Sequence, residues 1–305
     1  MFCEELRTVE RARLTAVASR DHQRAAAFRE EFGFDTAYGS YDEIFADPAV
    51  DIVYIVVPHA FHAELVERAM RAGKAVVCEK PLTPSQSETE RLVKISQECG
   101  VFLMEALKTG FLPAIQQAVL WVKEKAIGDP RILRADFCFV GSQDPNDRLL
   151  NPQLAGGSVL DVGIYPLSLA RILLGEITDL KATGRLAATG VDQSAAISTR
   201  HADHGAIASL TCSIHASYSL DAVVLGTKGK ILLPHSPRAT EATLVPDDGE
   251  SITFQSPDET RVVAEIVAAM NAMDQGLLEC PGHTHSDSIA LAAAMDQAIA
   301  QIADQ

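Results

Sequence analysis

Glycine pairs separated by a single residue are absent from this 305-residue sequence, although it contains 19 glycines. The Gly-x-Gly-x-x-Gly turn that cradles the pyrophosphate of a dinucleotide is therefore missing. No uninterrupted apolar run reaches the ~18 residues that a membrane-spanning helix needs. Basic residues are outnumbered, 26 against 41 acidic ones, and the net charge of −15 repels phosphates. We expect neither a nucleic-acid nor a membrane partner.

The six cysteines show no paired spacing, and several lie in apolar runs. This usage is typical of buried free thiols in a reducing compartment. Residues 1–7 contain two early acids and no long apolar core, unlike a secretory signal. The sequence therefore predicts a cytoplasmic protein that is long enough for two domains with their own cores.

Strand and helix patterns alternate through the first third of the chain. The predicted strands are 14–18, 51–57, 75–78 and 101–104, and the predicted helices are 2–11, 22–32, 41–46, 62–72 and 85–99. This alternation predicts a parallel, Rossmann-like sheet over residues 1–112. Its first strand and glycine turn are missing, since residues 2–11 already resemble the helix after such a turn. We expect the natural start to lie upstream, with a shortened homologue as the alternative.

Residues 113–305 have a different character, because several strands follow one another directly. The predicted elements are helices at 114–126, 156–174, 259–275 and 286–303, and strands at 131–139, 206–215, 222–225 and 230–233. A polar loop at 141–153 separates the first strand from the second helix. The pattern predicts an α+β domain with a large mixed or antiparallel sheet and helices on one face.

Lys80 follows the apolar strand at 75–78 directly, within Glu79-Lys80-Pro81. Ligands of open α/β sheets bind at the carboxyl ends of strands, so this amine can be offered to a substrate oxygen. The alternative is a lysine that ends the strand and pairs with Glu79 in solvent. Glu105, which ends a later strand, is expected to face the same cleft.

Ser19 and Arg20 end the strand at 14–18. An acid at this point would accept the ribose 2′-hydroxyl of NAD, whereas an arginine accommodates the 2′-phosphate of NADP. A guanidinium can bind that phosphate through two hydrogen bonds. The sequence thus favours NADP over NAD, with an ordinary solvated arginine as the alternative.

Asp161 and Tyr165 lie four residues apart in a predicted helix, so they share one helix face. A carboxylate and a phenol can then converge on one substrate. A phenol is a poor base at neutral pH unless a cation lowers its pKa, and Lys80 is the cation that we expect to do so. The alternatives are a helix-start acid favoured by the dipole and a phenol at a domain boundary.

Two histidine groups carry side chains that can bind metals, His201 with His204, and His283 with His285 and Asp287. Both lie in turn-like regions, where solvated loops are the simpler interpretation. We predict no metal. There is also no Gly-x-Ser-x-Gly elbow that would indicate a hydrolase.

Six motifs taken together and in order resemble the Gfo/Idh/MocA oxidoreductase family. They are residues 16–21, 57–62, 78–82, 102–106, 126–129 and 156–167. The resemblance covers nearly the whole chain. Met-Glu-Ala and Asp-x-Gly-x-Tyr-Pro are most similar to the branch that contains dimeric dihydrodiol dehydrogenase and NADP-dependent D-xylose dehydrogenase.

The resemblance implies a Rossmann domain followed by a substrate domain whose open sheet forms a homodimer. It implies hydride transfer between nicotinamide and a carbinol carbon of a sugar or trans-dihydrodiol. The implied catalytic residues are Lys80, Asp161 and Tyr165. The implied cofactor-binding residues are Ser19, Arg20, Pro58, His59, His62, Glu79 and Lys80, with surface helix caps as the alternative for the two histidines.

One departure from the family pattern follows the Met-Glu-Ala motif. Lys108 stands where an aromatic residue is common, and Gly110 stands where relatives have an arginine. With the missing glycine turn, this leaves an alternative function, a non-catalytic sugar-binding or regulatory homologue that has lost dinucleotide binding. We expect weak or no NADP binding and low solubility. The dehydrogenase hypothesis requires the Lys80 amine and the Tyr165 hydroxyl to reach one small molecule.

Overall fold

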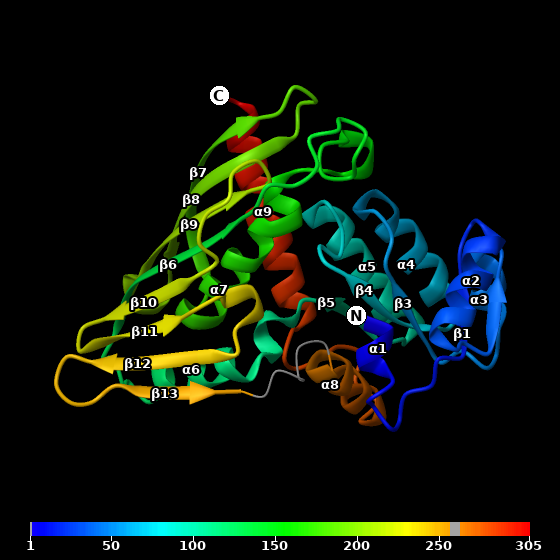
Figure 1. Cartoon of the computed structure of the whole chain (residues 1–305), viewed down its shortest axis with the longest axis horizontal. Coiled ribbons are helices and arrows are strands. Elements are labelled where there is room, and N and C mark those ends of the chain that lie inside the picture. Colours follow the sequence, from blue (N-terminus) through cyan, green and yellow to red (C-terminus); the bar gives the residue numbers. More distant parts are fainter. Residues whose placement is uncertain (1, 257–262) are drawn as a thin grey trace.

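The computed structural model describes residues 2–256 and 263–305. Parallel strands with flanking helices form one part of the molecule, and a large sheet forms the other (Figure 1). The N-terminus lies between the two parts, close to α8 (Val263–Asp274).

The predicted alternation of strands and helices in the first part is confirmed. The elements are, in order, α1 (Phe2–Leu6), β1 (Ala16–Ala18), α2 (His22–Phe32), β2 (Thr36–Tyr38), α3 (Tyr41–Ala46), β3 (Ile52–Ile55), α4 (His62–Arg71), β4 (Ala75–Glu79), α5 (Gln86–Cys99) and β5 (Leu103–Ala106). Strand β2 was not predicted, and α1 ends five residues before the expected position at 11. Asp21 caps α2 by accepting from two backbone N–H groups, and Gly33 ends it with φ +70°.

The parallel strands form two separate sheets, β1-β2 and β3-β4-β5. In the doubly wound order 3-2-1-4-5-6, the first strand lies between the second and the fourth. Here β1, β2 and β3 correspond to the second, third and fourth strands of that order. Within the described part of the chain no strand joins β1 to β3. The Rossmann-like sheet without its first strand is thus confirmed.

Helices cover both faces of β3-β4-β5 (Figure 1). On one face Val66 of α4 and Leu92 of α5 are fully buried in one apolar cluster with β4. On the other face Ala269 and Ala272 of α8 pack with Val77. Helix α8 therefore packs on the first sheet although it follows the second in sequence. Residues 259–262 of its predicted range lie outside the described residues.

The second part contains an eight-stranded sheet in the order β13-β12-β11-β10-β6-β9-β8-β7. Its elements are α6 (Pro113–Lys123), β6 (Pro130–Cys138), α7 (Ile164–Leu174), β7 (Ile177–Leu186), β8 (Asp192–His201), β9 (Ile207–Ser213), β10 (Ala222–Gly226), β11 (Gly229–Leu233), β12 (Glu241–Pro246), β13 (Ile252–Gln255) and α9 (His285–Ala303). Strands β6 and β9 are parallel and the other neighbours are antiparallel, so the predicted mixed sheet is confirmed.

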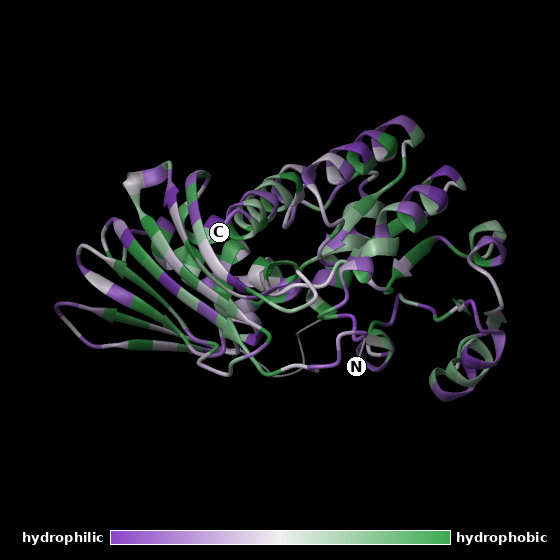
Figure 2. Ribbon diagram, turned by 90° about the horizontal axis from the view of Figure 1, so that it is seen from above, coloured by the Kyte–Doolittle hydropathy of each residue, from purple (hydrophilic) through white to green (hydrophobic). Residues whose placement is uncertain are grey.

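One face of this sheet packs against α6, α7 and α9, where Leu133 and Leu210 are buried in the main core. Along β8 and β9 buried and exposed residues alternate, which leaves Ile207 41% exposed on the opposite face. The alternating hydropathy of these strands is visible in Figure 2. The sheet therefore has one covered and one open face.

Residues Pro152–Leu174 are long and apolar enough to cross a membrane, with a mean hydropathy of 1.4. The segment contains Asp161 and Arg171, so it is not an uninterrupted apolar run. Within the protein, 83% of the apolar window is buried. The segment is a core element of the second part and includes α7.

Candidate active site

Lys80 extends from the end of β4 into the second part of the molecule. Its Nζ donates to the backbone oxygen of Asp161 at 2.5 Å and lies 3.3 Å from Asp161 Oδ1. The same nitrogen lies 5.3 Å from the centroid of the Tyr165 ring. The alternative interpretation paired Lys80 with Glu79. Glu79 accepts a hydrogen bond from the Tyr54 hydroxyl at 2.5 Å. The two sequence segments therefore converge on one point.

The local sequence removes one helical partner of the Asp161 carbonyl, which accepts from Lys80. Residues Val159–Gly163 form a π-helical turn that runs into α7. In such a turn the carbonyl of residue 161 accepts from the N–H of residue 166. That residue is Pro166, which has no N–H, so this helical bond cannot form. A lysine from the other part of the molecule uses the carbonyl instead.

Asp192 fixes the start of this π-helical turn from β8. Its Oδ2 accepts from Ser158 Oγ at 2.5 Å and from the Val159 N–H at 2.7 Å. Gly157 has φ +127°, and a Cβ at this position would clash with Asp192 Oδ1. Because only glycine fits there, the turn comes close enough to Asp192 for both bonds.

The Asp161 carboxylate is 5% exposed and lies among three nitrogen-bearing side chains. Arg148 donates to its Oδ1 at 2.9 Å, and His59 Nε2 lies 4.0 Å from the same atom. Burial alone would raise the pKa of Asp161, but the charges of Lys80 and Arg148 outweigh burial and lower it. The sequence did not single out Arg148, because nothing distinguishes it from the other charges of the polar loop.

His59 supplies a neutral acceptor beside Lys80. Its Nδ1 donates to the Ala155 carbonyl at 3.1 Å, so Nε2 is the nitrogen without a proton. Burial, together with the nearby Lys80 charge, lowers the pKa of His59 to about 4. The imidazole is therefore uncharged at neutral pH and directs its free nitrogen toward Asp161.

Tyr165 is a protonated phenol in this arrangement. Burial raises its pKa above the ordinary value, and the carboxylates of Glu79 and Asp161 raise it further. The expectation that Lys80 lowers this pKa is corrected. The Lys80 ammonium lies over the ring face and binds Asp161, while carboxylates act on the hydroxyl.

The predicted cofactor residues lie in two groups. Pro58 and His59 follow β3, with His59 near the charge of Lys80, whereas Ser19 and Arg20 follow β1 in the other small sheet. The Arg20 guanidinium lies 5.4 Å from the centroid of Phe61, within the 3-10 turn that begins at His59.

His62 is the exception among these residues, because it is fully buried. Its ring nitrogens face the Pro81 carbonyl at 2.8 Å and the Val57 carbonyl at 2.9 Å. The expectation that His62 contacts a cofactor is corrected. The His62 imidazole contacts the backbone of the loop that carries Lys80.

The two histidine groups considered for metal are tied into local structure. His201 faces the Gly175 carbonyl and Thr199, His285 bonds the Leu103 carbonyl, and His283 bonds Glu105. The side chain of His204 lies outside what the structure describes. Within residues 2–256 and 263–305, no group of three acidic, histidine or cysteine side chains is placed to hold a metal. Glu105 is 3% exposed, so its expected position in the cleft is also corrected.

A separate polar cluster lies beside Glu79, at the departure from the family pattern. Lys108 begins the 3-10 turn Lys108–Phe111, and burial with the Arg238 charge lowers its pKa. Glu265 of α8 is 4% exposed, and its Oε2 has no hydrogen-bond partner among residues 2–256 and 263–305. Burial, with the Glu79 charge, raises the pKa of Glu265 to about 8.

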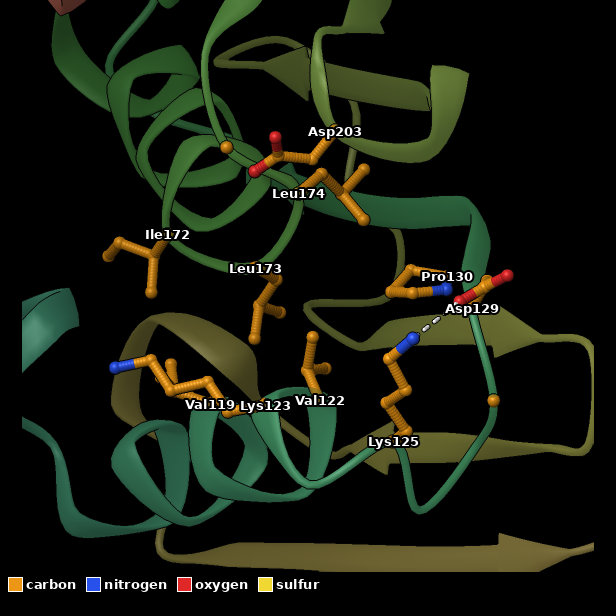
Figure 3. Close-up of a pocket in the computed structure, with 12 residues that line it drawn as sticks. Val119, Val122, Lys123, Lys125, Asp129, Pro130, Ile172, Leu173, Leu174 and Asp203 are labelled. Atoms are coloured by element: carbon orange, nitrogen blue, oxygen red, sulfur yellow. Dashed lines mark ion pairs between the residues drawn. The ribbon is translucent and has the colours of Figure 1, made fainter.

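A cavity of about 270 Å³ lies in the second part, between the ends of α6 and α7 (Figure 3). Apolar side chains such as Val122 and Leu173 point into it, and a 3.6 Å ion pair between Lys125 and Asp129 lies at its rim. Neither Lys80 nor Tyr165 lines it. This cavity is therefore distinct from the candidate active site.

Both parts of the chain are similar to known protein families. Residues 2–107 match the model of an oxidoreductase family with an NAD-binding Rossmann fold, and residues 115–232 match the GFO/IDH/MocA C-terminal domain. A trans-1,2-dihydrobenzene-1,2-diol dehydrogenase of Danio rerio is 32% identical over 99% of this chain and 92% of its own length. The Mus musculus enzyme of the same name is 36% identical over 80% of this chain and 72% of its own length.

Two solved structures are similar over nearly the entire chain. A 3-ketoreductase from Actinomadura kijaniata in complex with NADP and TDP-benzene has a TM-score of 0.87 and 28% identity, covering 99% of this chain and 93% of its own. An aldose-aldose oxidoreductase from Caulobacter crescentus complexed with glycerol has a TM-score of 0.89 and 24% identity, covering 100% and 93%. The second likeness concerns the fold alone.

Proposed function

This chain belongs to the Gfo/Idh/MocA family of oxidoreductases, and from that premise we propose that it moves hydride between NADP and a carbinol carbon of a sugar or cyclic trans-diol. The convergence of Lys80, Asp161 and Tyr165 on one point carries the proposal. The names of the related dehydrogenases support the substrate class. We further propose that residues 1–112 bind the dinucleotide and that residues 113–305 bind the substrate.

The residues fit a nicotinamide cofactor at the carboxyl ends of β1, β3 and β4. Those ends are followed by Arg20, by Pro58 with His59, and by Lys80, and of these Lys80 and His59 reach Asp161 of the second part. NADP would be held there by Arg20 at its 2′-phosphate and by the segment at Pro58, and it would supply or accept the hydride. The pyrophosphate cradle is the part of the usual site that this sequence lacks.

In the direction of reduction, the Lys80 ammonium donates to the substrate carbonyl oxygen and stabilises the charge that develops on it. The protonated Tyr165 hydroxyl then delivers its proton to that oxygen, so the C=O group becomes H–C–O–H with one hydride and one proton added. Asp161 holds the ammonium in place through two contacts. His59 Nε2 is available to accept from a neighbouring substrate hydroxyl.

Turnover of a panel of aldoses and cyclic diols tests this function. At millimolar NADP we expect oxidation of at least one polyol, because high cofactor concentration compensates for weak binding. Loss of two charge-assisted bonds to the pyrophosphate weakens binding by about 3 kcal/mol or more, equivalent to at least about 100-fold. Calorimetry should therefore give a weak NADPH isotherm with a weaker one for NADH. If none of the polyols reduces NADP, the result contradicts the proposal.

Arg20→Ala is the matched variant for the cofactor preference. Its side chain is exposed at the end of β1, so the fold is expected to tolerate the change. NADPH should bind about tenfold more weakly to the variant, while NADH should bind as before. Equal weakening for both dinucleotides would show that Arg20 does not contact a 2′-phosphate.

The raised pKa of Tyr165 predicts the pH dependence of the two directions. Because the phenol stays protonated through neutral pH, kcat/KM for carbinol oxidation should rise about tenfold per pH unit between about pH 7 and about pH 10. Reduction needs the protonated phenol and should stay flat over the same range. His59 does not titrate in this window, since its pKa is about 4. Initial rates in both directions measure this, and a plateau of the oxidation rate below about pH 8 would show a lowered pKa instead.

The alternative function, a non-catalytic sugar-binding or regulatory homologue, has one observation in its favour. The gap between β1 and β3 lies where a dinucleotide-binding turn belongs. Sugar binding in calorimetry without any cofactor-dependent turnover would favour this alternative.

We also propose a homodimer formed through the open face of the large sheet, where Ile207 is exposed. The size of the particle in light scattering tests this assembly. A cytoplasmic location is supported by the six cysteines, all of which are free thiols.

A further inference from the structure

The peptide unit that follows Lys80-Pro81 is held at both of its polar atoms by buried side chains. The Pro81 carbonyl lies 2.8 Å from His62 Nδ1. The N–H of the same peptide belongs to Leu82 and donates to Glu105 Oε1 at 2.8 Å. Both side chains are inaccessible, with His62 fully buried and Glu105 3% exposed. The backbone next to Lys80 is therefore fixed within the interior.

The second oxygen of Glu105 connects this peptide to a distant segment of the chain. His283 Nε2 lies 2.9 Å from Glu105 Oε2, and Ser288 Oγ donates to the same oxygen at 2.8 Å. His283 and Ser288 are themselves buried, and their side chains lie 3.0 Å apart. Burial alone would raise the pKa of Glu105. The hydrogen bonds from His283, Ser288 and Leu82, together with the electrostatic interaction with His283, outweigh burial and lower the pKa. All polar atoms of the carboxylate are satisfied, so the connection is rigid.

The same segment, at the start of α9, also holds the helix that carries Tyr165. Asp287 belongs to the capping box of α9 with Thr284, and its Oδ1 accepts from Arg171 Nε at 3.0 Å. Arg171 lies in α7, which carries Tyr165 near its first turn. The loop of Lys80 and the helix of Tyr165 are thus anchored to neighbouring residues of one segment.

We propose that Glu105 is a positioning residue that sets the Lys80 amine against Asp161 and Tyr165 by tying the Leu82 N–H to the start of α9. The proposal rests on the role of Lys80 proposed above. It assigns a function to a buried carboxylate and to His283, one of the histidines considered for metal in the sequence.

The test compares Glu105→Ala and Ser288→Ala with Asp296→Ala as the matched control. Like Glu105, Asp296 has a carboxylate that accepts a backbone N–H of the first part, here from Gln86 at 2.8 Å, but it lies in α9 and Gln86 lies outside the Lys80 loop. Ser288→Ala removes one hydrogen bond to Glu105 and leaves the carboxylate in place. It therefore tests the proposal even if Glu105→Ala does not fold. Circular dichroism establishes folding for each variant.

Two measurements do not depend on turnover. Hydrogen exchange of the Leu82 amide, followed by NMR, should be about tenfold faster or more in Glu105→Ala, because its acceptor is lost. Acylation of Lys80 by an amine-reactive reagent, followed by mass spectrometry, should also accelerate in both Glu105→Ala and Ser288→Ala. The control should leave both rates unchanged. Unchanged rates in Glu105→Ala would overturn the proposal.

Turnover then separates positioning from general stability. In the wild-type background Glu105→Ala should lower kcat about tenfold, with KM for cofactor unchanged, because a misplaced amine affects the chemical step. In a Lys80→Met background the same substitution should change kcat less than about twofold, since no amine remains to be positioned. Equal losses in both backgrounds would overturn the proposal. Absence of turnover in the wild-type protein would count against the proposed function, while exchange and acylation would still decide the role of Glu105.

Discussion

Lys80→Met is expected to lower kcat by about 1,000-fold at saturating cofactor and substrate, with little change in the far-ultraviolet spectrum. Removing one donor to a developing oxyanion costs about 100-fold to about 1,000-fold in well-studied enzymes. The larger figure applies here because the ammonium is the one cation that contacts both Asp161 and the Tyr165 ring within the described residues. Methionine retains the length and apolar stem of the side chain, so packing losses are small.

Lys74→Met is the matched control for this experiment. Lys74 lies just before the other end of the same strand, is 9% exposed, and donates to the carbonyls of Asp47 and Val50. Its loss removes a donor from the buried Val50 carbonyl and one of two donors from the Asp47 carbonyl, which also accepts from the Val50 N–H, and should lower the free energy of unfolding by about 2 kcal/mol while leaving kcat near the wild-type value. Steady-state kinetics and urea unfolding of the two variants provide the comparison. Equal kcat values for Lys80→Met and the wild type would show that Lys80 has no role in the mechanism.

The elements that sequence reasoning located are those with local signals. Helix α2 was predicted with its observed bounds, because Asp21 and Gly33 mark its two ends. Strand β2 was missed because Thr36–Tyr38 is too short for an alternating pattern. The convergence of Lys80, Asp161 and Tyr165 was anticipated from the end of a strand, a four-residue spacing and the family resemblance, but the bond between Lys80 and Asp161 was not. That bond, to a backbone carbonyl that Pro166 deprives of one helical partner, depends on a π-helical turn that no periodicity predicts.

The contacts that sequence reasoning missed join residues over long separations. Glu105 and His283 are 178 residues apart, and each alone has an ordinary local explanation. The Tyr165 pKa was assigned the wrong direction for a similar reason. The sequence shows which charges exist near the motif, but the balance between one cation over the ring and several carboxylates near the hydroxyl depends on tertiary placement.

Asp161→Ala is the second substitution with a large expected effect, because it changes both stability and rate. The buried carboxylate is the shared partner of Lys80 and Arg148, so its removal leaves Lys80 without a counter-charge. Breaking a buried pair in this way costs about 3 kcal/mol of unfolding free energy. Because the ammonium keeps its bond to the backbone carbonyl of residue 161 but loses the carboxylate that also orients it, kcat should fall by about 100-fold.

The pH dependence of that stability loss identifies its electrostatic origin. The pKa of Asp161 is lowered in the folded protein, so its contribution is present above the unfolded value of about 3.9 and is lost as pH falls through the folded pKa. Urea unfolding should therefore show a wild-type advantage at neutral pH that shrinks in acid. Asp35→Ala, which breaks the exposed ion pair with Arg13, should cost less than about 1 kcal/mol at any pH. A loss in Asp161→Ala that stays constant in acid would mean that packing, not charge, holds Lys80 in place.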